Sequence, residues 1–126
     1  MNDPTGLAGP AQQFITDMTA VGAPARSDGP RILYDVVAVG GALSGQTVTT
    51  GVSVSELHSW PMVPPHWIHL PESVTFPATN MDDTDCQPGW KRHSRDFSYT
   101  DMSMPPALAW LRHVRGFISI AIPRAA

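Results

Sequence analysis

The segment that decides the fold reads Trp60-Pro61-Met62-Val63-Pro64-Pro65-His66-Trp67-Ile68-His69-Leu70. The three prolines within residues 61–65 have no backbone N–H to donate, so this part of the segment cannot be a central strand. We therefore predict a rigid, extended connector here. The residues that follow, 66–70, are expected to form a short strand that ends at Pro71.

The residues before this connector predict two paired strands. From Gln46 to Leu57 apolar and polar residues alternate, and this period of two indicates an antiparallel strand with one buried face. The two expected faces are Val48, Thr50, Val52 and Val54 on one side, and Thr47, Thr49, Ser53 and Ser55 on the other. The segment from Ile32 to Val39 is rich in β-branched residues and predicts the partner strand. Residues 25–30 are expected to be a turn.

A helix is predicted before the strands, at residues 11–21. Pro10 suits the first helical turn, where its missing N–H is not needed. Gly22 and Pro24 are expected to end the helix. Residues 1–10 as a whole are expected to be a loose N-terminus. The apolar face of this helix consists of Phe14, Ile15, Met18 and Val21.

A second helix is predicted near the end of the sequence. Ser103 is the expected N-cap, with Pro105 and Pro106 in the first turn. The expected apolar stripe consists of Ala107, Trp110, Leu111, Val114, Phe117 and Ile118. Strands grouped between two helices predict one α+β domain over residues 1–126. In this domain the helices pack on one face of an antiparallel meander sheet of about four strands.

The composition narrows the class of protein. The chain has 126 residues, a formal net charge of −3 and a single cysteine, Cys86. One cysteine excludes an internal disulfide, and the weak negative charge gives no electrostatic footprint for nucleic acid. The sequence shows no signal peptide and no apolar run long enough for a membrane helix. We therefore expect a cytoplasmic protein that binds neither nucleic acid nor membrane.

The order of the predicted elements, with Trp60-Pro61-x-x-Pro64-Pro65 among them, resembles the UBC fold of ubiquitin-conjugating enzymes. In that family an aromatic-Pro-x-x-Pro-Pro element leads into the fourth strand, and the catalytic cysteine lies about twenty residues beyond it. Here Cys86 follows Pro65 by 21 residues. A tryptophan shortly after the cysteine is also common in the family, and Trp90 occupies that position here. The resemblance covers roughly residues 11–118.

The resemblance implies an activity centred on Cys86, which would accept a ubiquitin-like protein as a thioester and pass it to an amine. The family carries His-Pro-Asn before the cysteine, and its Asn supports the oxyanion. This sequence reads Phe76-Pro77-Ala78-Thr79-Asn80, so Asn80 is the candidate for that role and the His is absent. The segment 89–95 resembles divergent bacterial UBC-like proteins, which carry a histidine after the cysteine, as His93 does here. His93 or Asp85 would then assist proton transfer.

The same resemblance implies partners and surfaces that bind them. The expected partners are a ubiquitin-like protein and an activating-enzyme-like protein, which tend to be encoded beside such bacterial proteins. The first helix of the family docks the activating enzyme. The candidate partner-binding residues are Phe14, Trp60, Pro61, Pro64, Pro65 and Trp90. The oligomeric state stays open.

The residues around Cys86 in the sequence suggest a thiol of low general reactivity. Residues 77–88 lack apolar periodicity and predict a long loop, which is more often functional than accidental. Nearby aspartates disfavour the thiolate, so the pKa of Cys86 is expected to be raised. These aspartates are Asp82, Asp83 and Asp85. Lys91 is the only lysine and lies five residues from Cys86, which predicts self-modification at Lys91.

No metal or other cofactor is expected. His66 and His69 could be drawn as zinc ligands with Cys86 and His93. On a strand, however, positions 66 and 69 point to opposite faces, and the spacing fits no usual zinc pattern.

Two further hypotheses stand beside the enzyme. A catalytically inactive UBC-like adaptor in a bacterial protein assembly would explain the missing His-Pro-Asn motif and the small size. A structural subunit of a larger assembly would bury the region of Trp60 and Trp67 against its partners. For Cys86 itself, the alternative is an incidental cysteine on a surface loop.

Overall fold

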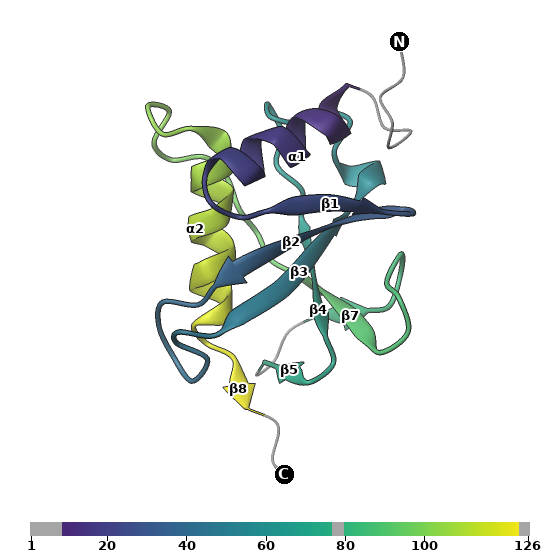
Figure 1. Ribbon diagram of the computed structural model, residues 1–126, viewed down its shortest axis with the longest axis vertical. Helices are drawn as coiled ribbons and strands as arrows, with labels where there is room; N and C mark the ends of the chain where they lie inside the picture. Colours follow the sequence, from purple (N-terminus) through teal and green to yellow (C-terminus); the bar gives the residue numbers. More distant parts are fainter. Residues whose placement is uncertain (1–8, 77–79, 124–126) are drawn as a thin grey trace.

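The computed structural model describes residues 9–76 and 80–123. Two helices and eight strands lie within these residues (Figure 1). In chain order the elements are α1 (Pro10–Ala20), β1 (Ala25–Asp28), β2 (Arg31–Val37), β3 (Thr47–Ser53), the short 3-10 helix η1 (Val54–Glu56), β4 (Trp67–Pro71), β5 (Val74–Thr75), β6 (Met81–Asp82), β7 (Trp90–Ser94), α2 (Pro106–Ile118) and β8 (Ile122–Pro123).

Six strands form one antiparallel sheet in the order β1-β2-β3-β4-β7-β6, and β5 pairs with β8 in a second, two-stranded sheet. The predicted α+β class with an antiparallel sheet is therefore confirmed. Strands β1 to β4 are consecutive neighbours, as in a meander. The sheet continues beyond the predicted meander because β7 pairs with β4, and β6 pairs with the far edge of β7.

The predicted turn at residues 25–30 is wrong. Residues 25–28 form β1, which pairs residue by residue with β2, from Ala25 opposite Tyr34 to Asp28 opposite Arg31. Only Gly29 and Pro30 remain for the turn. β1 is an edge strand whose residues are half-buried or exposed, so its sequence carries no apolar alternation.

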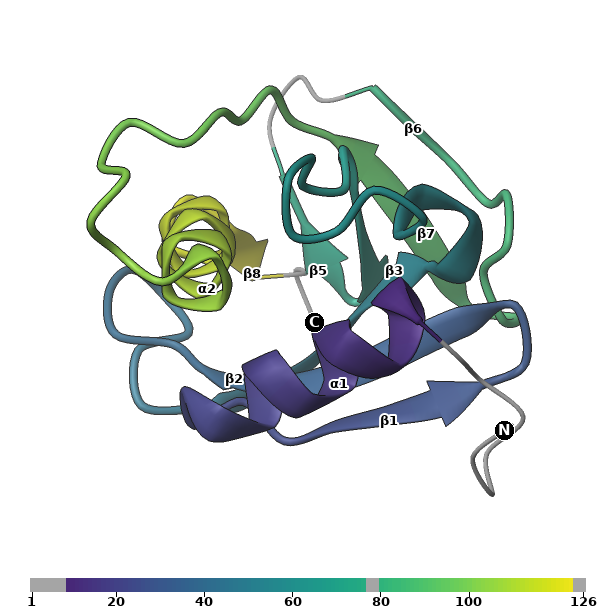
Figure 2. The same cartoon turned by 90° about the horizontal axis from the view of Figure 1, so that it is seen from above.

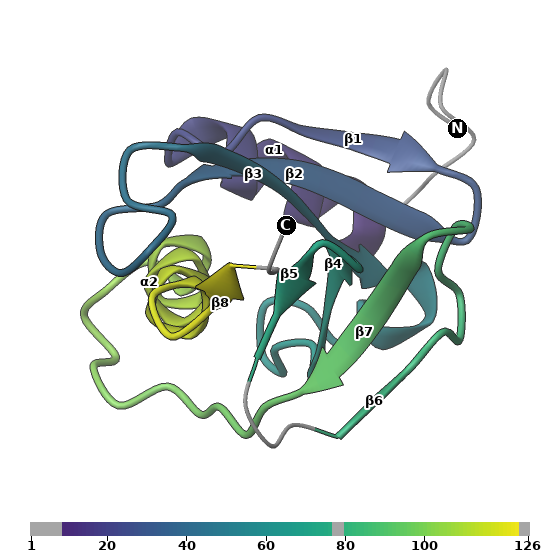
Figure 3. The ribbon, with the colours of Figure 1, turned by 90° about the horizontal axis from the view of Figure 1, so that it is seen from below.

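Both helices pack against one face of the sheet, which we call the inner face. The views along α2 show this helix end-on inside the curve of the sheet (Figures 2 and 3). The Phe14 ring of α1 lies 5.7 Å from the Tyr34 ring of β2, and Trp110 Nε1 of α2 donates to the Tyr34 hydroxyl at 3.0 Å. The buried residues of the inner face are Ile32, Tyr34, Val36, Val48, Thr50, Val52, Ile68, Leu70 and His93.

The predicted helices are found, with a correction at one cap. All six residues of the predicted apolar stripe on α2 are buried, because its apolar positions follow the helical period. The N-cap of α2 is Pro105, not Ser103. The Ser103 hydroxyl instead donates to Asp101 Oδ1 in the preceding turn. α1 already includes Pro10, and the remainder of the loose N-terminus predicted at 1–10 lies mostly outside the described residues.

The proline-rich connector packs onto α1. Trp60 is only 4% exposed, its ring lies 4.9 Å from that of Phe14, and its Nε1 donates to Asp17 Oδ2 at 3.0 Å. Phe14 is fully buried in the same cluster. In the described part of the chain, neither helix is long and apolar enough to cross a membrane.

The opposite, outer face of the sheet is covered locally by polar residues. Ser53 and His69 are both fully buried there, although the alternation of β3 predicted Ser53 on the solvent side. Gly51 lies directly opposite His69 on the neighbouring strand, and a Cβ at Gly51 would stand 3.3 Å from His69 Cβ. The absence of a side chain at Gly51 therefore leaves room for the imidazole on this face.

Candidate functional site

Cys86 lies on the connection between β6 and β7, residues 83–89, which we call the cysteine loop. The sequence predicted a structureless run at 77–88. Residues 77–79 lie outside the described part, and Met81–Asp82 forms β6, so the loop is shorter than predicted. A tight turn places the cysteine, because the Cys86 N–H donates to the Asp83 carbonyl at 3.0 Å. Asp85 takes a φ of 59°, an uncommon left-handed conformation for a residue other than glycine.

Two arginines hold this loop against the outer face. Arg31 Nη1 of β2 donates to the Asp85 carbonyl at 2.9 Å, and its Nε donates to Asp28 at 2.8 Å. Arg92 of β7 forms two hydrogen bonds to the Asp82 carboxylate, at 2.6 and 3.3 Å. This pairing holds the pKa of Asp82 well below its usual range. The loop is therefore anchored at its start and immediately before Cys86.

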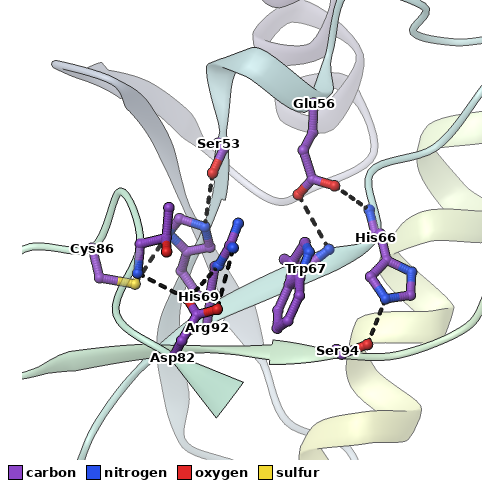
Figure 4. A network of polar contacts seen from close by, with 10 residues as sticks. Ser53, Glu56, His66, Trp67, His69, Asp82, Cys86, Arg92 and Ser94 are labelled. Atoms are coloured by element: carbon purple, nitrogen blue, oxygen red, sulfur yellow. Dashed lines mark hydrogen bonds and ion pairs between the residues drawn. The ribbon is translucent and has the colours of Figure 1, made fainter. Parts of the chain in front are cut away.

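The anchored loop places the thiol beside a buried histidine (Figure 4). Cys86 Sγ lies 3.6 Å from His69 Nδ1, and His69 Nε2 lies 3.2 Å from the Ser53 hydroxyl. Cys86 is half-buried, whereas His69 and Ser53 are fully buried. Thiol, imidazole and hydroxyl thus form one hydrogen-bonded row across β4 and β3. A nucleophile beside a base that is itself oriented by a third group is one arrangement by which a thiol can be activated during a reaction.

The protonation of this row follows from its burial. Burial raises the pKa of the Cys86 thiol to about 11; Asp82 and Asp83 add to the rise, and Arg92 and Arg31 oppose it. The predicted direction is confirmed, but burial outweighs the aspartates. Burial also lowers the pKa of His69 to about 4, with Arg92 as the next cause. At neutral pH the resting pair is therefore a neutral thiol beside a neutral imidazole.

His93, predicted to assist proton transfer, lies on the other side of the sheet. It pairs with Ile68 and faces the inner core, where its ring lies 4.8 Å from Phe76 and 5.5 Å from Phe117. Burial lowers its pKa to about 4. Because neighbouring residues of a strand alternate between faces, Arg92 shares the face of Cys86 and His93 does not. The histidine that contacts the thiol is His69.

Asn80 and Asp85, the other predicted catalytic residues, take part through their main chains. The Asn80 carbonyl accepts from the Ser94 N–H at 2.9 Å, and its side chain is exposed at the end of β6. The Asp85 carbonyl is the group that Arg31 binds. The described contacts therefore give both residues a part in placing the loop. An oxyanion role for the Asn80 amide stays a prediction.

The predicted partner-binding residues fall into two groups. Phe14, Trp60 and Pro65 are buried, so they belong to the core and offer no docking surface. The burial of Trp60 also removes it from the surface that the structural-subunit hypothesis required. Partly exposed are Pro61, Pro64 and Trp90.

Lys91 also lies away from the thiol. It pairs with Leu70 of the inner face, and it lines a hollow of about 320 Å³ together with Glu72 and His93. Its neighbour Arg92 points to the outer face, over the Trp67 ring at 4.1 Å. The strand alternation thus directs Lys91 away from Cys86. The placement gives no support to capture of an acyl group by Lys91 in the same chain.

A second polar group lies at the start of β4 (Figure 4). The Glu56 carboxylate accepts from the backbone N–H groups of His66 and Trp67, at 3.0 and 3.2 Å. His66 Nε2 lies 2.5 Å from the Ser94 hydroxyl. These contacts fix the strand that carries His69. Among the described residues, no group of three or more His, Cys, Asp or Glu side chains is placed to hold a metal ion.

Sequence reasoning missed His69 and Ser53 as site residues, although part of the signal was present. Ile68 and Leu70 are apolar, so alternation puts His69 on the opposite face. The same alternation separates Ser53 from Val52. The sequence pattern does not predict that the cysteine loop folds back over that face.

No protein-family model, curated protein or solved structure matches this chain. A functional assignment therefore rests on the row formed by Cys86, His69 and Ser53 and on the surfaces around it.

Proposed function

We propose that this chain is a ubiquitin-like protein conjugating enzyme. In this proposal Cys86 accepts a ubiquitin-like protein as a thioester from an activating-enzyme-like protein and transfers it to an amine. The observation that carries the proposal is the 3.6 Å contact between Cys86 Sγ and His69 Nδ1 on an anchored, half-buried loop. The order of helix, meander, proline-rich connector, cysteine loop and helix, which resembles the UBC fold, adds support.

The chemistry assigns a role to the thiol and to the imidazole of the row. When the incoming thioester reaches Cys86, its thiol proton passes to His69 Nδ1 while the sulfur attacks the carbonyl carbon. A new C–S bond forms, and the thiolate of the activating enzyme leaves and takes up a proton. The raised pKa of Cys86 keeps the free enzyme as a thiol, which reacts slowly with general oxidants and electrophiles. Acyl exchange then depends on a docked donor.

One observation favours a second candidate, a UBC-like adaptor without catalysis. Burial holds the pKa of Cys86 near 11, so the thiolate is a very small fraction of the protein at neutral pH. In an adaptor the His69 contact would be structural only. Such a protein would bind a ubiquitin-like protein or its activating enzyme without forming a covalent adduct.

The two functions are separated by incubating the chain with ATP, a ubiquitin-like protein ending in glycine and its activating enzyme, taken from the same gene neighbourhood. The conjugating enzyme is expected to form an adduct on non-reducing gels that disappears with thiol reagents and in Cys86→Ser. The activating enzyme's own thioester shows that the partner set is active. An active set that binds the chain but yields no adduct would contradict the enzyme and favour the adaptor.

A further inference from the structure

The histidine beside the thiol indicates which chemical classes of acyl acceptor the site can use. We propose that His69, oriented by Ser53, allows a thioester on Cys86 to be transferred to hydroxyl acceptors, water included, as well as to amines. This inference rests on the proposed function and extends its substrate class. Its support is the continuous row of Cys86 Sγ, His69 and the buried Ser53 hydroxyl.

Amines and hydroxyls differ in what they need from the enzyme. A lysine amine that has lost its proton is a good nucleophile and can attack a thioester without help. A hydroxyl is a weak nucleophile until a base removes its proton as the new bond forms. A site with a neutral imidazole next to the sulfur supplies that base. The discharge of the thioester to a deprotonated amine does not require it.

The geometry brings His69 within reach of the acceptor. An attacking oxygen approaches the sulfur-bound carbonyl carbon to about 3 Å before reaction. Its proton can then lie within hydrogen-bond reach of a nitrogen that is itself 3.6 Å from the sulfur. In the tautomer that carries its proton on Nε2, His69 donates to the Ser53 hydroxyl 3.2 Å away, and the Nδ1 lone pair is directed at the reacting atoms.

The step balances without any further reactant. The acceptor oxygen forms a C–O bond to the carbonyl carbon, and its proton moves to His69 Nδ1. The C–S bond breaks, and the Cys86 thiolate takes the proton back from His69. The product is an ester, or a free carboxylic acid when water is the acceptor, and the enzyme returns to thiol and neutral imidazole. Because burial keeps the imidazole neutral at pH 7, the base is in its working form.

The test uses the full chain loaded on Cys86 with a synthetic peptide ending in Gly-Gly, supplied as the thioester of 2-mercaptoethanesulfonate. Loading of the wild type is measured first by intact mass, and its failure to load counts against the proposed function itself. Because His69 also takes part in acyl exchange onto Cys86, each variant is exposed to the thioester until it reaches the same loading. The loaded chain is then discharged at pH 8 in the presence of glycerol or of lysine. Ester and amide products are told apart by mass and by hydroxylamine, which cleaves the ester.

His69→Gln is expected to slow discharge to glycerol and water by at least about 100-fold, the usual range for removal of a general base. Discharge to lysine is expected to change much less. His58→Gln, at an exposed histidine just before the connector, is the matched control and should leave both rates unchanged. An equal effect of His69→Gln on both acceptors, or no effect on either, would overturn the inference.

Ser53→Ala tests the same row while keeping the histidine. The imidazole then loses its orienting partner, so glycerol discharge should fall while lysine discharge persists. The ring ¹⁵N shifts of His69 report the accompanying change of tautomer. A loaded chain that discharges to lysine but not to glycerol or water in the wild type would also overturn the inference and leave the conjugating function standing.

Discussion

Among single residues, the two buried histidines of the sheet have opposite surroundings. His69 lies on the outer face with the thiol and a hydroxyl, whereas His93 lies on the inner face against Phe76 and Phe117. Both have lost most of their contact with water, with exposures of 0% and 2%. Desolvation therefore favours the neutral ring in both, and only His69 is placed to exchange a proton with Cys86.

This burial predicts a loss of stability in acid. The pKa of His69 and of His93 is lowered to about 4, below the ordinary 6.5, so the unfolded chain binds protons that the folded chain does not. Their contribution to stability is full above pH 6.5 and is lost as pH falls from 6.5 toward 4. At pH 5 the expected loss is about 2 kcal/mol for each histidine.

Urea unfolding at a series of pH values measures this effect. Burial lowers the pKa of His113 of α2 to about 4 as well, so the slope of the unfolding free energy between pH 6.5 and 4 should correspond to about three protons. His69→Gln and His93→Gln should each remove about one of them. A free energy of unfolding that stays constant over this range would contradict the neutral, buried state of both rings.

Among the elements, the cysteine loop depends on a strand far away in the sequence. Arg31 lies on β2, 54 residues before Asp85, and its side chain is only 16% exposed. Its guanidinium binds Asp28 of β1 and the Asp85 carbonyl together. One side chain thus links the edge strand, the sheet and the residue that precedes the thiol.

Arg31→Gln is therefore expected to free the loop. Loss of the hydrogen bond to the Asp85 carbonyl should weaken the closed loop by at least about 1 kcal/mol. The thiol would then be more exposed, and the burial that is the largest cause of its raised pKa would diminish. The lost charge of Arg31, which opposes that rise, is a smaller cause than burial, so the net effect is a more reactive thiol. Alkylation of Cys86 by iodoacetamide should accelerate severalfold, as followed by intact mass.

The matched control is Arg26→Gln, which breaks the exposed Arg26–Asp35 ion pair at 3.3 Å on the same two strands. A surface pair of this kind contributes little, so the alkylation rate should stay at the wild-type value. Equal rates in Arg31→Gln and the wild type would show that the loop does not depend on Arg31.

A second link between elements is a close approach of two backbones. Gly41, in the turn between β2 and β3, has φ +77°, and a Cβ there would stand 2.0 Å from the Ser119 carbonyl oxygen after α2. Gly45, in the same turn, has φ +84° but no atom within 4 Å of its Cβ position. The two glycines share the strained conformation and differ in the contact.

Alanine at each position separates these causes. Gly45→Ala is expected to lower the free energy of unfolding by about 1 kcal/mol through its backbone conformation. Gly41→Ala should cost clearly more, because α2 or the turn must move to remove the overlap. Urea denaturation measures both. An equal loss in the two variants would show that the turn does not approach α2 as described.

Helices and strands could be predicted from the sequence where the buried residues recur at a regular spacing. The stripe from Ala107 to Ile118 repeats at helical spacing, and all of it is buried. β1 was missed because Arg26 and Asp28 lie on an edge strand with water nearby. Such a strand is held by backbone pairing rather than by an apolar pattern, and backbone pairing leaves little trace in the side chains.

For the molecule as a whole, the position of the site depends on contacts that the sequence pattern does not contain. Both helices occupy the inner face, so the outer face is left to the cysteine loop (Figures 2 and 3). The spacing of residues in the sequence predicted only that Cys86 lies on a loop after the connector. Its pairing with His69 instead of His93 arises from strand alternation combined with the anchors at Arg31 and Arg92.

The position of Cys86 in the whole molecule bears on the proposed acyl transfer. Cys86 is half-buried and lies on the face away from both helices. An acyl group bound to its sulfur would therefore lie outside the hydrophobic core and would not disturb it. In the proposed transfer, the bound protein would lie over the outer face of the sheet, on which the Arg92 guanidinium also lies.

The proposed role of Cys86 as an acyl carrier can be tested on the chain taken from its own cells. The tagged chain is purified in acid, with free thiols blocked at once, and peptides containing Cys86 are identified by mass spectrometry. We predict that Cys86 carries a polypeptide joined through its C-terminal glycine by a thiol-sensitive bond. This adduct should be missing from Cys86→Ala. Recovery of Cys86 entirely as the blocked free thiol, from cells that contain the activating enzyme, would contradict the carrier role.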